Sequence, residues 1–324
     1  MSAANTTDTS PAAAATEERA TPEPTAIRTP EPATPQLVEV ETPAITPVTE
    51  PIDDEELEIE GWDRTTSTST SISTSIYRHS WENGRRFHSY KHGRYPIPND
   101  DIEQNREDIK HAMMLEITDG KLYYAPLSKN AQKIIDFLVD DAEEEWMNGD
   151  NYDLVHMRSM SSVLKDIPKV LRHSYSALKP GGWLEMQELQ AVLHCDDDTM
   201  PDDDGLLQYY KTLNSALTRF GMDLEMPRKL RSLLEEAGFV NIHHIPKKVP
   251  VGPWASDRYL RVAGLYLREA ISHLIPATTS KSFRALGLSE AECEMIAMSA
   301  RQALQDMSRH RYLPFHFWTA QKPE

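Results

Sequence analysis

The sequence contains few cysteines and no long apolar run. Its two cysteines, Cys195 and Cys293, lie far apart in a chain of 324 residues and lack CxxC spacing. Neither a disulfide framework nor a metal site is indicated, and a reducing, intracellular compartment fits best. No apolar run reaches the roughly 20 residues that span a bilayer, and the N-terminus lacks a signal-peptide pattern. We expect a soluble protein of the cytoplasm or nucleus without membrane contact.

Basic residues are also scarce. The formal net charge is −17, and much of the negative charge lies in the first sixty residues, whose only basic side chains are Arg19 and Arg28. The remainder of the chain is mildly acidic and shows no basic stretch of the kind that binds a phosphate backbone. Direct nucleic-acid binding is therefore not expected.

The N-terminal quarter lacks the large apolar residues that a core needs. Residues 1–76 are rich in Thr, Pro, Ala, Ser and Glu and close in the run TTSTSTSISTS. Because such a composition buries too little apolar surface to fold, we predict a disordered tail over 1–76 and one domain over 77–324. The aromatic segment that begins the domain is expected to dock through Trp81 and Tyr95 as a flap, with a substrate-gating lid as the alternative.

Amphipathic and apolar stretches alternate from there on. A helix is predicted after Asn99, which starts a capping sequence, with Ile102, Ile109 and Met113 on one face. The run Ile134 to Val139 is apolar and bounded by charges. That pattern is typical of a buried parallel strand.

The forty residues from Asn151 to Gln190 predict a complete βαβ unit. Tyr152 to Met157 is the first strand, and Asp166 can cap a helix whose first turn contains Pro168. The segment 179–182, Lys-Pro-Gly-Gly, is expected to stop the helix and turn the chain into the second strand. A crossover of this kind is right-handed by default.

Four helices and two strands complete the prediction. The helices are expected at 206–220, 230–237, 254–274 and 290–309, and the strands at 239–249 and 314–320. Strands that alternate with helices, followed by a last strand rich in aromatic residues, predict a doubly wound α/β sheet with a helical insertion.

Three stretches of this chain resemble class I S-adenosylmethionine-dependent methyltransferases. They are YDLVHMRSM, LRHSYSALKPGGWLEMQE and LLEEAGFVNI. DGKLYYAP and DDAEEEW narrow the resemblance to the LaeA-like group of fungal methyltransferases, from about Ser80 to the C-terminus. The resemblance implies a Rossmann-like sheet with a helical cap and S-adenosylmethionine as cofactor. Its implied partner is a small-molecule intermediate of secondary metabolism or a protein.

The glycine-rich loop of that family has no counterpart here. In the family, the first strand ends in a Gly-x-Gly loop, and an acidic residue after the second strand holds the ribose. Here Ile134–Asp136 resembles the start of strand one and Phe137–Asp141 the end of strand three. Roughly 45 residues of the doubly wound pattern are absent. We therefore predict a truncated sheet of about five strands, with the fused strand at an edge beside Tyr152–Met157.

The resemblance also transfers candidate site residues. The candidates for cofactor binding are Asp136, Asp141, Ala142, His156 and Arg158. Methyl transfer needs a base only where the acceptor loses a proton, and the candidates for that role are His156 first and Glu188 second. A packed strand residue is the alternative for His156, and a solvated loop acid is the alternative for Asp141.

Several functional alternatives stay open at this stage. The chain is either a methyltransferase that modifies a pathway intermediate or regulates expression, or an inactive member that acts as an accessory or regulatory binding protein. Loss of the ribose contact alone would weaken cofactor binding by roughly 1 to 3 kcal/mol. A third possibility is that the translated sequence skips a coding segment, which transcript sequencing across the Asp136–Phe137 junction would reveal.

Two further polar clusters are expected to be structural. The acidic residues in 196–198 and 202–204 lack the ligand spacing of a calcium-binding loop, so we expect solvated loops there. His243 and His244 are adjacent in a predicted strand and should therefore point to opposite faces.

Overall fold

The computed structural model describes residues 42–49, 79–82, 84–88, 96–137, 142–147, 149–279 and 281–324. The predicted disordered tail thus lies outside the described residues, except for 42–49. Two other residues singled out in the sequence, Tyr95 and Asp141, also lie outside them.

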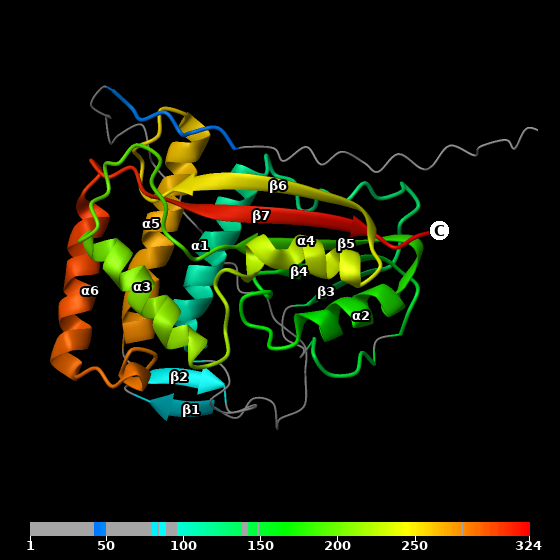
Figure 1. The fold of residues 1–324 in the computed structure, drawn as a ribbon, viewed down its shortest axis with the longest axis horizontal. Coiled ribbons are helices and arrows are strands. Elements are labelled where there is room, and N and C mark those ends of the chain that lie inside the picture. The colour runs from blue at the N-terminus through cyan, green and yellow to red at the C-terminus, as the bar shows by residue number, and fades with distance from the viewer. Residues whose placement is uncertain are drawn as a thin grey trace, which may run out of the picture. The chain divides into compact units, whose positions relative to one another are not determined.

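Five strands form one mixed sheet in the order β3-β4-β5-β7-β6 (Figure 1). They are β3 (Ile134–Phe137), β4 (Tyr152–Arg158), β5 (Leu178–Leu189), β6 (Val240–Pro250) and β7 (Tyr312–Gln321). β3, β4 and β5 are parallel, and β7 runs antiparallel between β5 and β6. The predicted α/β sheet of five strands is confirmed, with β3 at the edge beside β4.

Helix α2 (Ile167–Ala177) connects β4 to β5, as predicted. The Asp166 side chain accepts a hydrogen bond from the backbone N–H of Lys169 at 2.9 Å and caps the helix. The Lys-Pro-Gly-Gly segment was expected to be a turn, but it forms the first part of β5. A Cβ atom at Gly182 would lie 2.9 Å from the backbone oxygen of Tyr152. Only glycine lets the two strands approach this closely, because a Cβ would displace a backbone that has no room to move.

Two hydrophobic cores cover the two faces of the sheet. Val155 and Met157 of β4 belong to the core beneath α2 and α4 (Met226–Glu236). Because side chains alternate along a strand, His156 and Arg158 point to the opposite face. The other core contains residues of α1 (Asp101–Ile117), α3 (Gly205–Thr218), α5 (Arg258–Thr279) and α6 (Glu290–Gln305). Figure 1 shows α3, α5 and α6 gathered beyond the end of the sheet toward which β6 points.

Helix α1 buries a face that matches the predicted one only in part. Met113 is buried, but Ile102 is 50% exposed. Glu103 and Arg106 occupy the buried positions instead, and they form an ion pair within the helix. A buried charge is tolerated when its partner is buried with it. Apolar periodicity therefore located the helix correctly and its buried face in part, because Met113 is buried, Ile109 is half-buried and only Ile102 is exposed.

A β-hairpin precedes α1 in the chain. Its strands are β1 (His79–Glu82) and β2 (Arg85–His88). The prediction that Trp81 docks this segment is wrong, because its side chain is 69% exposed. Phe87 is buried instead, with the Lys281 ammonium 4.5 Å from the centre of its ring. Lys281 also pairs with Glu82 at 3.0 Å.

Residues 42–49 lie against the segment that leads into α5. The backbone N–H of Val48 donates to the Trp254 carbonyl at 2.8 Å, and that of Ser256 donates to the Thr46 carbonyl at 2.7 Å. Ile45 packs on the buried cluster that contains Trp254 and Tyr312. Residues of 42–49 thus contact the domain, and the predicted disorder of the tail stays a prediction.

Three of the six aspartates between β5 and α3 have ion-pair partners elsewhere in the fold. Asp204 caps α3 and forms a buried ion pair with Arg311. Asp196 pairs with Lys248 at 2.6 Å, and Asp197 pairs with a histidine near the start of β7. The expectation of solvated loops is wrong for Asp204, which is buried; Asp196 and Asp197 are exposed, although each has a partner far along the chain.

Candidate active site

Polar side chains gather where the three parallel strands end. β3 ends at Phe137, β4 at Arg158 and β5 at Leu189, at the same edge of the sheet. Ligands of doubly wound sheets bind in the crevice outside these carboxyl ends. Helix α1 passes close by, because His111 contacts Arg158. The candidate site therefore lies at the carboxyl ends of β3, β4 and β5.

Asp136 and His156 are paired across β3 and β4. They are register partners, and Nδ1 of His156 lies 3.0 Å from Oδ1 of Asp136. The hydrogen bond from His156 lowers the pKa of Asp136, although burial opposes that shift. A carboxylate can only accept, so Nδ1 of His156 donates and Nε2 is left as the second ring position. Nε2 is buried, and no described residue hydrogen-bonds to it.

Arg158 is held by two neutral acceptors. Its Nε donates to Oε1 of Gln187 at 3.1 Å, and its Nη1 donates to Nδ1 of His111 at 2.9 Å. Burial and the Arg158 charge lower the pKa of His111, so the ring is a neutral acceptor at pH 7. Burial also lowers the pKa of Arg158. Within the described part of the chain, Arg158 forms no ion pair.

Glu188 holds the segment that follows β4. Its carboxylate accepts from the backbone N–H of Met160 at 3.2 Å and from the N–H and hydroxyl of Ser161 at 3.0 and 2.8 Å. Ser159 starts this segment in the left-handed region, with φ 54°. Glu188 is 1% exposed, and burial raises its pKa to about 7 although the three hydrogen bonds oppose the shift. The near-neutral pKa is the kind that suits proton transfer.

Two more buried carboxylates hold the segment that leads into β3. Glu185 accepts from the backbone N–H groups of residues 124 and 125, and Asp153 accepts from those of residues 132 and 133. Chiefly through its bond from Lys179, the pKa of Asp153 is lowered to about 2. The chain before β3 is thus fixed to β4 and β5 by side-chain acceptors.

The sequence-predicted residues divide into three groups. Asp136, His156 and Arg158 lie on one face at the carboxyl ends of β3 and β4. Glu188, by contrast, points to the other face of β5 from Gln187 and holds the segment after β4. Ala142 is 1% exposed and packs in the core beneath α2. Its role in cofactor binding, like that of Asp141 outside the described residues, stays a prediction.

Sequence reasoning missed three residues of this site. His111 and Gln187 hold Arg158, and Lys110 precedes His111 on α1 and lines the neighbouring pocket. No sequence pattern pointed to His111, because its partner lies 47 residues away. Gln187 could have been found, since it is the position on β5 that pairs with the end of β4.

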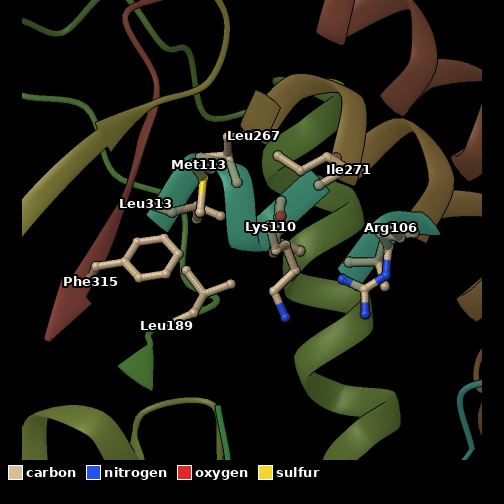
Figure 2. Close-up of a pocket in the computed structure, with 11 residues that line it drawn as sticks. Arg106, Lys110, Met113, Leu189, Leu267, Ile271, Leu313 and Phe315 are labelled. Atoms are coloured by element: carbon tan, nitrogen blue, oxygen red, sulfur yellow. The ribbon is translucent and has the colours of Figure 1, made fainter. Parts of the chain in front are cut away.

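A small pocket lies next to this edge. Its lining comes from α1, α3, α5, β7 and the end of β5, and its volume of about 20 Å³ holds roughly one water molecule. The apolar lining includes Met113, Leu189, Leu267, Ile271, Leu313 and Phe315. Figure 2 shows that the nitrogens of Arg106 and Lys110 point the same way, away from Met113 and Leu267. A larger ligand enters only if these side chains move apart.

Lys110 and Arg106 share an acidic neighbour, Glu107. Lys110 Nζ donates to the Glu107 carboxylate at 2.9 and 3.1 Å, and Arg106 also contacts it. Burial alone would raise the pKa of Glu107, but Lys110 and Arg106 lower it to about 2. Both cations at the pocket are therefore already paired.

The sequence is similar to methyltransferases, in agreement with the α/β fold. A family described as a methyltransferase domain matches residues 89–244. Methyltransferase pytC of Aspergillus terreus is 30% identical over 300 residues, which cover 80% of this chain and 93% of the relative. Secondary metabolism regulator LAE1 of Cochliobolus heterostrophus is 26% identical over 290 residues, covering 75% and 94%. The probable methyltransferase tdiE of Emericella nidulans is 26% identical over 263 residues, covering 69% and 83%.

The cofactor of this family is S-adenosylmethionine, which carries hydroxyl, amino and carboxylate groups. Nε2 of His156 and three N–H groups of Arg158 have no partner among the described residues and fit such polar groups at the carboxyl ends of the strands. The sequence has no glycine between Gly120 and Gly149, and residues 138–141 lie outside the described part. The absent glycine loop therefore stays a prediction. By its sheet and its similarity to pytC, the chain belongs to the class I S-adenosylmethionine-dependent methyltransferases.

Proposed function

We propose that this protein transfers the methyl group of S-adenosylmethionine to a small-molecule acceptor of fungal secondary metabolism. The relatives support the metabolic setting, because pytC and tdiE are named as methyltransferases and LAE1 as a regulator of secondary metabolism. The observation that carries the proposal is the Asp136–His156 pair, whose second ring nitrogen is buried without a partner among the described residues.

The Asp136–His156 pair is suited to proton abstraction. When bound, S-adenosylmethionine supplies an electrophilic methyl group, and an acceptor hydroxyl must lose its proton as its oxygen takes that group. His156 holds the proton at Nε2, while Asp136 accepts from Nδ1–H and stabilises the imidazolium. The same pairing keeps Nε2 of the neutral ring free to act as the base.

Glu188 is the second candidate for the base. Its pKa of about 7 suits the role, but its oxygens already accept three hydrogen bonds from Met160 and Ser161. His156 is preferred, because its Nε2 accepts none from the described residues. In the proposal Glu188 fixes the backbone after β4, and the apolar pocket beyond Leu189 receives the acceptor and excludes water.

The partner and the compartment are also part of the proposal. No helix within the described ranges is both long enough and apolar enough to cross a membrane. Two cysteines without disulfide spacing fit a reducing compartment, so we place the protein in the cytoplasm or nucleus. A protein acceptor or protein partner is the alternative to a small molecule, since one of the relatives is named as a regulator.

A methyl-transfer assay tests the proposal. The full-length chain is incubated with methyl-labelled S-adenosylmethionine at millimolar concentration and a panel of phenols and enols, and products are identified by mass spectrometry. We expect the label on an oxygen of at least one panel member and not in a reaction without the protein. Calorimetry under the same conditions reports whether the cofactor is bound. Bound cofactor without transfer to any member or to added protein contradicts the proposal.

A further inference from the structure

Arg158 has more hydrogen-bond donors than its surroundings use. A guanidinium carries five N–H groups in a rigid fork. One N–H of Nη1 donates to His111 and Nε donates to Gln187. The three remaining N–H groups, including both on Nη2, meet no acceptor in the part of the chain that the structure describes. The side chain is half-buried, so bulk water does not surround it freely.

The acids around Arg158 are committed elsewhere. Asp136 is bonded to His156, Glu185 to the backbone of residues 124 and 125, and Glu107 to Lys110. These three carboxylates are near enough to favour the charged form of Arg158, but none forms an ion pair with it. Glu188 is occupied by the segment after β4. The described hydrogen-bond partners of the Arg158 guanidinium, His111 and Gln187, are thus both neutral.

The fixed orientation of Arg158 adds to this argument. His111 of α1 and Gln187 of β5 hold the guanidinium from two sides, at 2.9 and 3.1 Å. A guanidinium locked in this way loses little conformational entropy when it binds a planar anion. Two parallel N–H groups match the two oxygens of a carboxylate. The location is also suitable, because Arg158 ends β4 at the ligand-binding edge of the sheet.

We propose that Arg158 is the anchor of a carboxylate-binding site, positioned by His111 and Gln187. This inference rests on the proposed function for its setting and deepens it by naming the group that the site recognises. The carboxylate can come from two sources, the amino-acid end of the methyl donor or an acid group of the acceptor. Both require the same chemistry from Arg158, and binding measurements distinguish them.

Two pairs of probes test the site by calorimetry on the full-length chain. S-adenosylhomocysteine carries the amino-acid carboxylate, and methylthioadenosine is the same nucleoside thioether without it. Phenylbutyrate and phenylbutanol form the second pair, which differs in an acid group on an apolar body. Each probe is titrated into the wild-type protein and into R158M, R158K and H111A. Arg172, an exposed residue of α2, supplies the matched control R172M.

The expected result is a selective loss of one carboxylate probe. R158M should weaken binding of S-adenosylhomocysteine or of phenylbutyrate by about 10- to 100-fold, with the matching neutral probe unchanged, since a charge-assisted bidentate pair is lost. R158K keeps the charge without the fork, so a partial loss is expected, and H111A should show a similar partial loss. Loss for S-adenosylhomocysteine assigns the carboxylate to the donor, and loss for phenylbutyrate assigns it to the acceptor.

Other outcomes overturn the inference. They are equal binding by R158M and wild type for all probes, equal losses for acid and neutral probes, and no binding of any probe to the wild type. If R158M does not fold, as judged by its thermal transition, R158K and H111A decide in its place. These readouts need no turnover. A chain that binds carboxylates through Arg158 but transfers no methyl group contradicts only the proposed function, whereas a methyltransferase whose probe binding ignores Arg158 contradicts only this inference.

Discussion

Two buried histidine sites lie in the same sheet and differ in how completely their hydrogen bonds are made. On the β6–β7 side, Nε2 of His244 lies 2.9 Å from Nδ1 of His316, and Nε2 of His316 lies 3.0 Å from Oε1 of Gln190. The His244 ring also stacks on Trp318, with centroids 3.8 Å apart. On the β3–β4 side, His156 has one partner, Asp136, and its other nitrogen has none among the described residues.

Burial alone does not distinguish these two sites. His316 and His156 are each 6% exposed. Burial lowers the pKa of His316 to about 3 and that of His244 to about 4, so both rings are neutral at pH 7 and serve the fold. A buried polar atom without a partner costs about 1–3 kcal/mol and calls for an explanation. A ligand that completes the bond is such an explanation, and of the three histidines compared only His156 has such an atom in the described part of the chain.

The difference between the two histidine sites is tested most directly by replacing His156 and His244 in turn and measuring methyl transfer. H156Q should lower kcat by about 100-fold or more, because a general base contributes roughly 10²- to 10⁴-fold. H244Q, the matched control, should stay within about twofold of the wild type at pH 7.5, since the described contacts of His244, with His316 and Trp318, lie away from His156 on β6 and β7. An H156Q enzyme within tenfold of the wild type would remove the assigned role of His156.

Glu188 is a carboxylate that accepts three hydrogen bonds and still has a raised pKa. Its pKa is raised from 4.5 to about 7. Its contribution to stability is therefore complete below pH 4.5 and is lost as pH rises through about 7. We expect the wild type to lose about 3 kcal/mol of unfolding free energy over this range relative to E188Q. Urea unfolding of both proteins from pH 4.5 to 8 measures the difference.

E188Q itself loses a hydrogen bond, so its stability at a single pH is not informative. A glutamine can accept from Ser161 but presents an NH₂ group toward the Met160 N–H. That costs about 1 kcal/mol at every pH. The readout is the slope with pH, and parallel curves for the two proteins would show that Glu188 titrates normally.

The satisfied and unsatisfied histidines should also differ in stability. H316A removes the described partner of Nε2 of His244 and of Oε1 of Gln190 and opens a cavity, so we expect a loss of about 2 kcal/mol in unfolding free energy at pH 7.5. H156A removes a ring with one bond and one unpartnered nitrogen, so we expect a loss of about 1 kcal/mol or less. Urea unfolding measures both. Equal losses would mean that His156 is a structural residue like His316.

The smallest expected effect is on the affinity for S-adenosylmethionine. It depends on whether a glycine loop follows β3, the edge strand of the sheet. The predicted absence of the glycine loop implies that Cβ atoms keep the backbone from approaching the cofactor and that a paired ribose bond is missing. We expect S-adenosylmethionine to bind about tenfold or more weaker than micromolar. Calorimetry measures the dissociation constant. Binding in the micromolar range or tighter would contradict the absent loop, and transcript sequencing across the Asp136–Phe137 junction would then be the next step.

The fold could be predicted where local pattern and burial agree. The Asp166 cap, the helix behind it and the apolar strand around Val155 were all recovered, because each depends on residues close in sequence. His243 and His244 were also placed correctly on opposite faces, since His243 lies near Trp183 and His244 stacks on Trp318. Alternation along a strand is a strong constraint.

The site was predicted only in part, because its contacts are long-range. The family resemblance supplied Asp136, His156 and Arg158, and the structure brings them together. It could not show that His111 holds Arg158, because nothing in α1 marks which of its polar residues faces the sheet. The buried face of α1 was predicted only in part for the same kind of reason: the sequence does not show that Glu103 and Arg106 are buried as an ion pair.

Gly182 has a consequence for how this sequence can drift. The backbone oxygen of Tyr152 leaves no room for a side chain at this position, whatever chemistry the protein performs. Selection on activity and selection on foldability therefore act on different residues of the same forty-residue stretch. A descendant that had lost the histidine and arginine at the end of β4 would still need this glycine to close the sheet. We therefore expect the glycine at this position to persist in relatives that no longer catalyse methyl transfer.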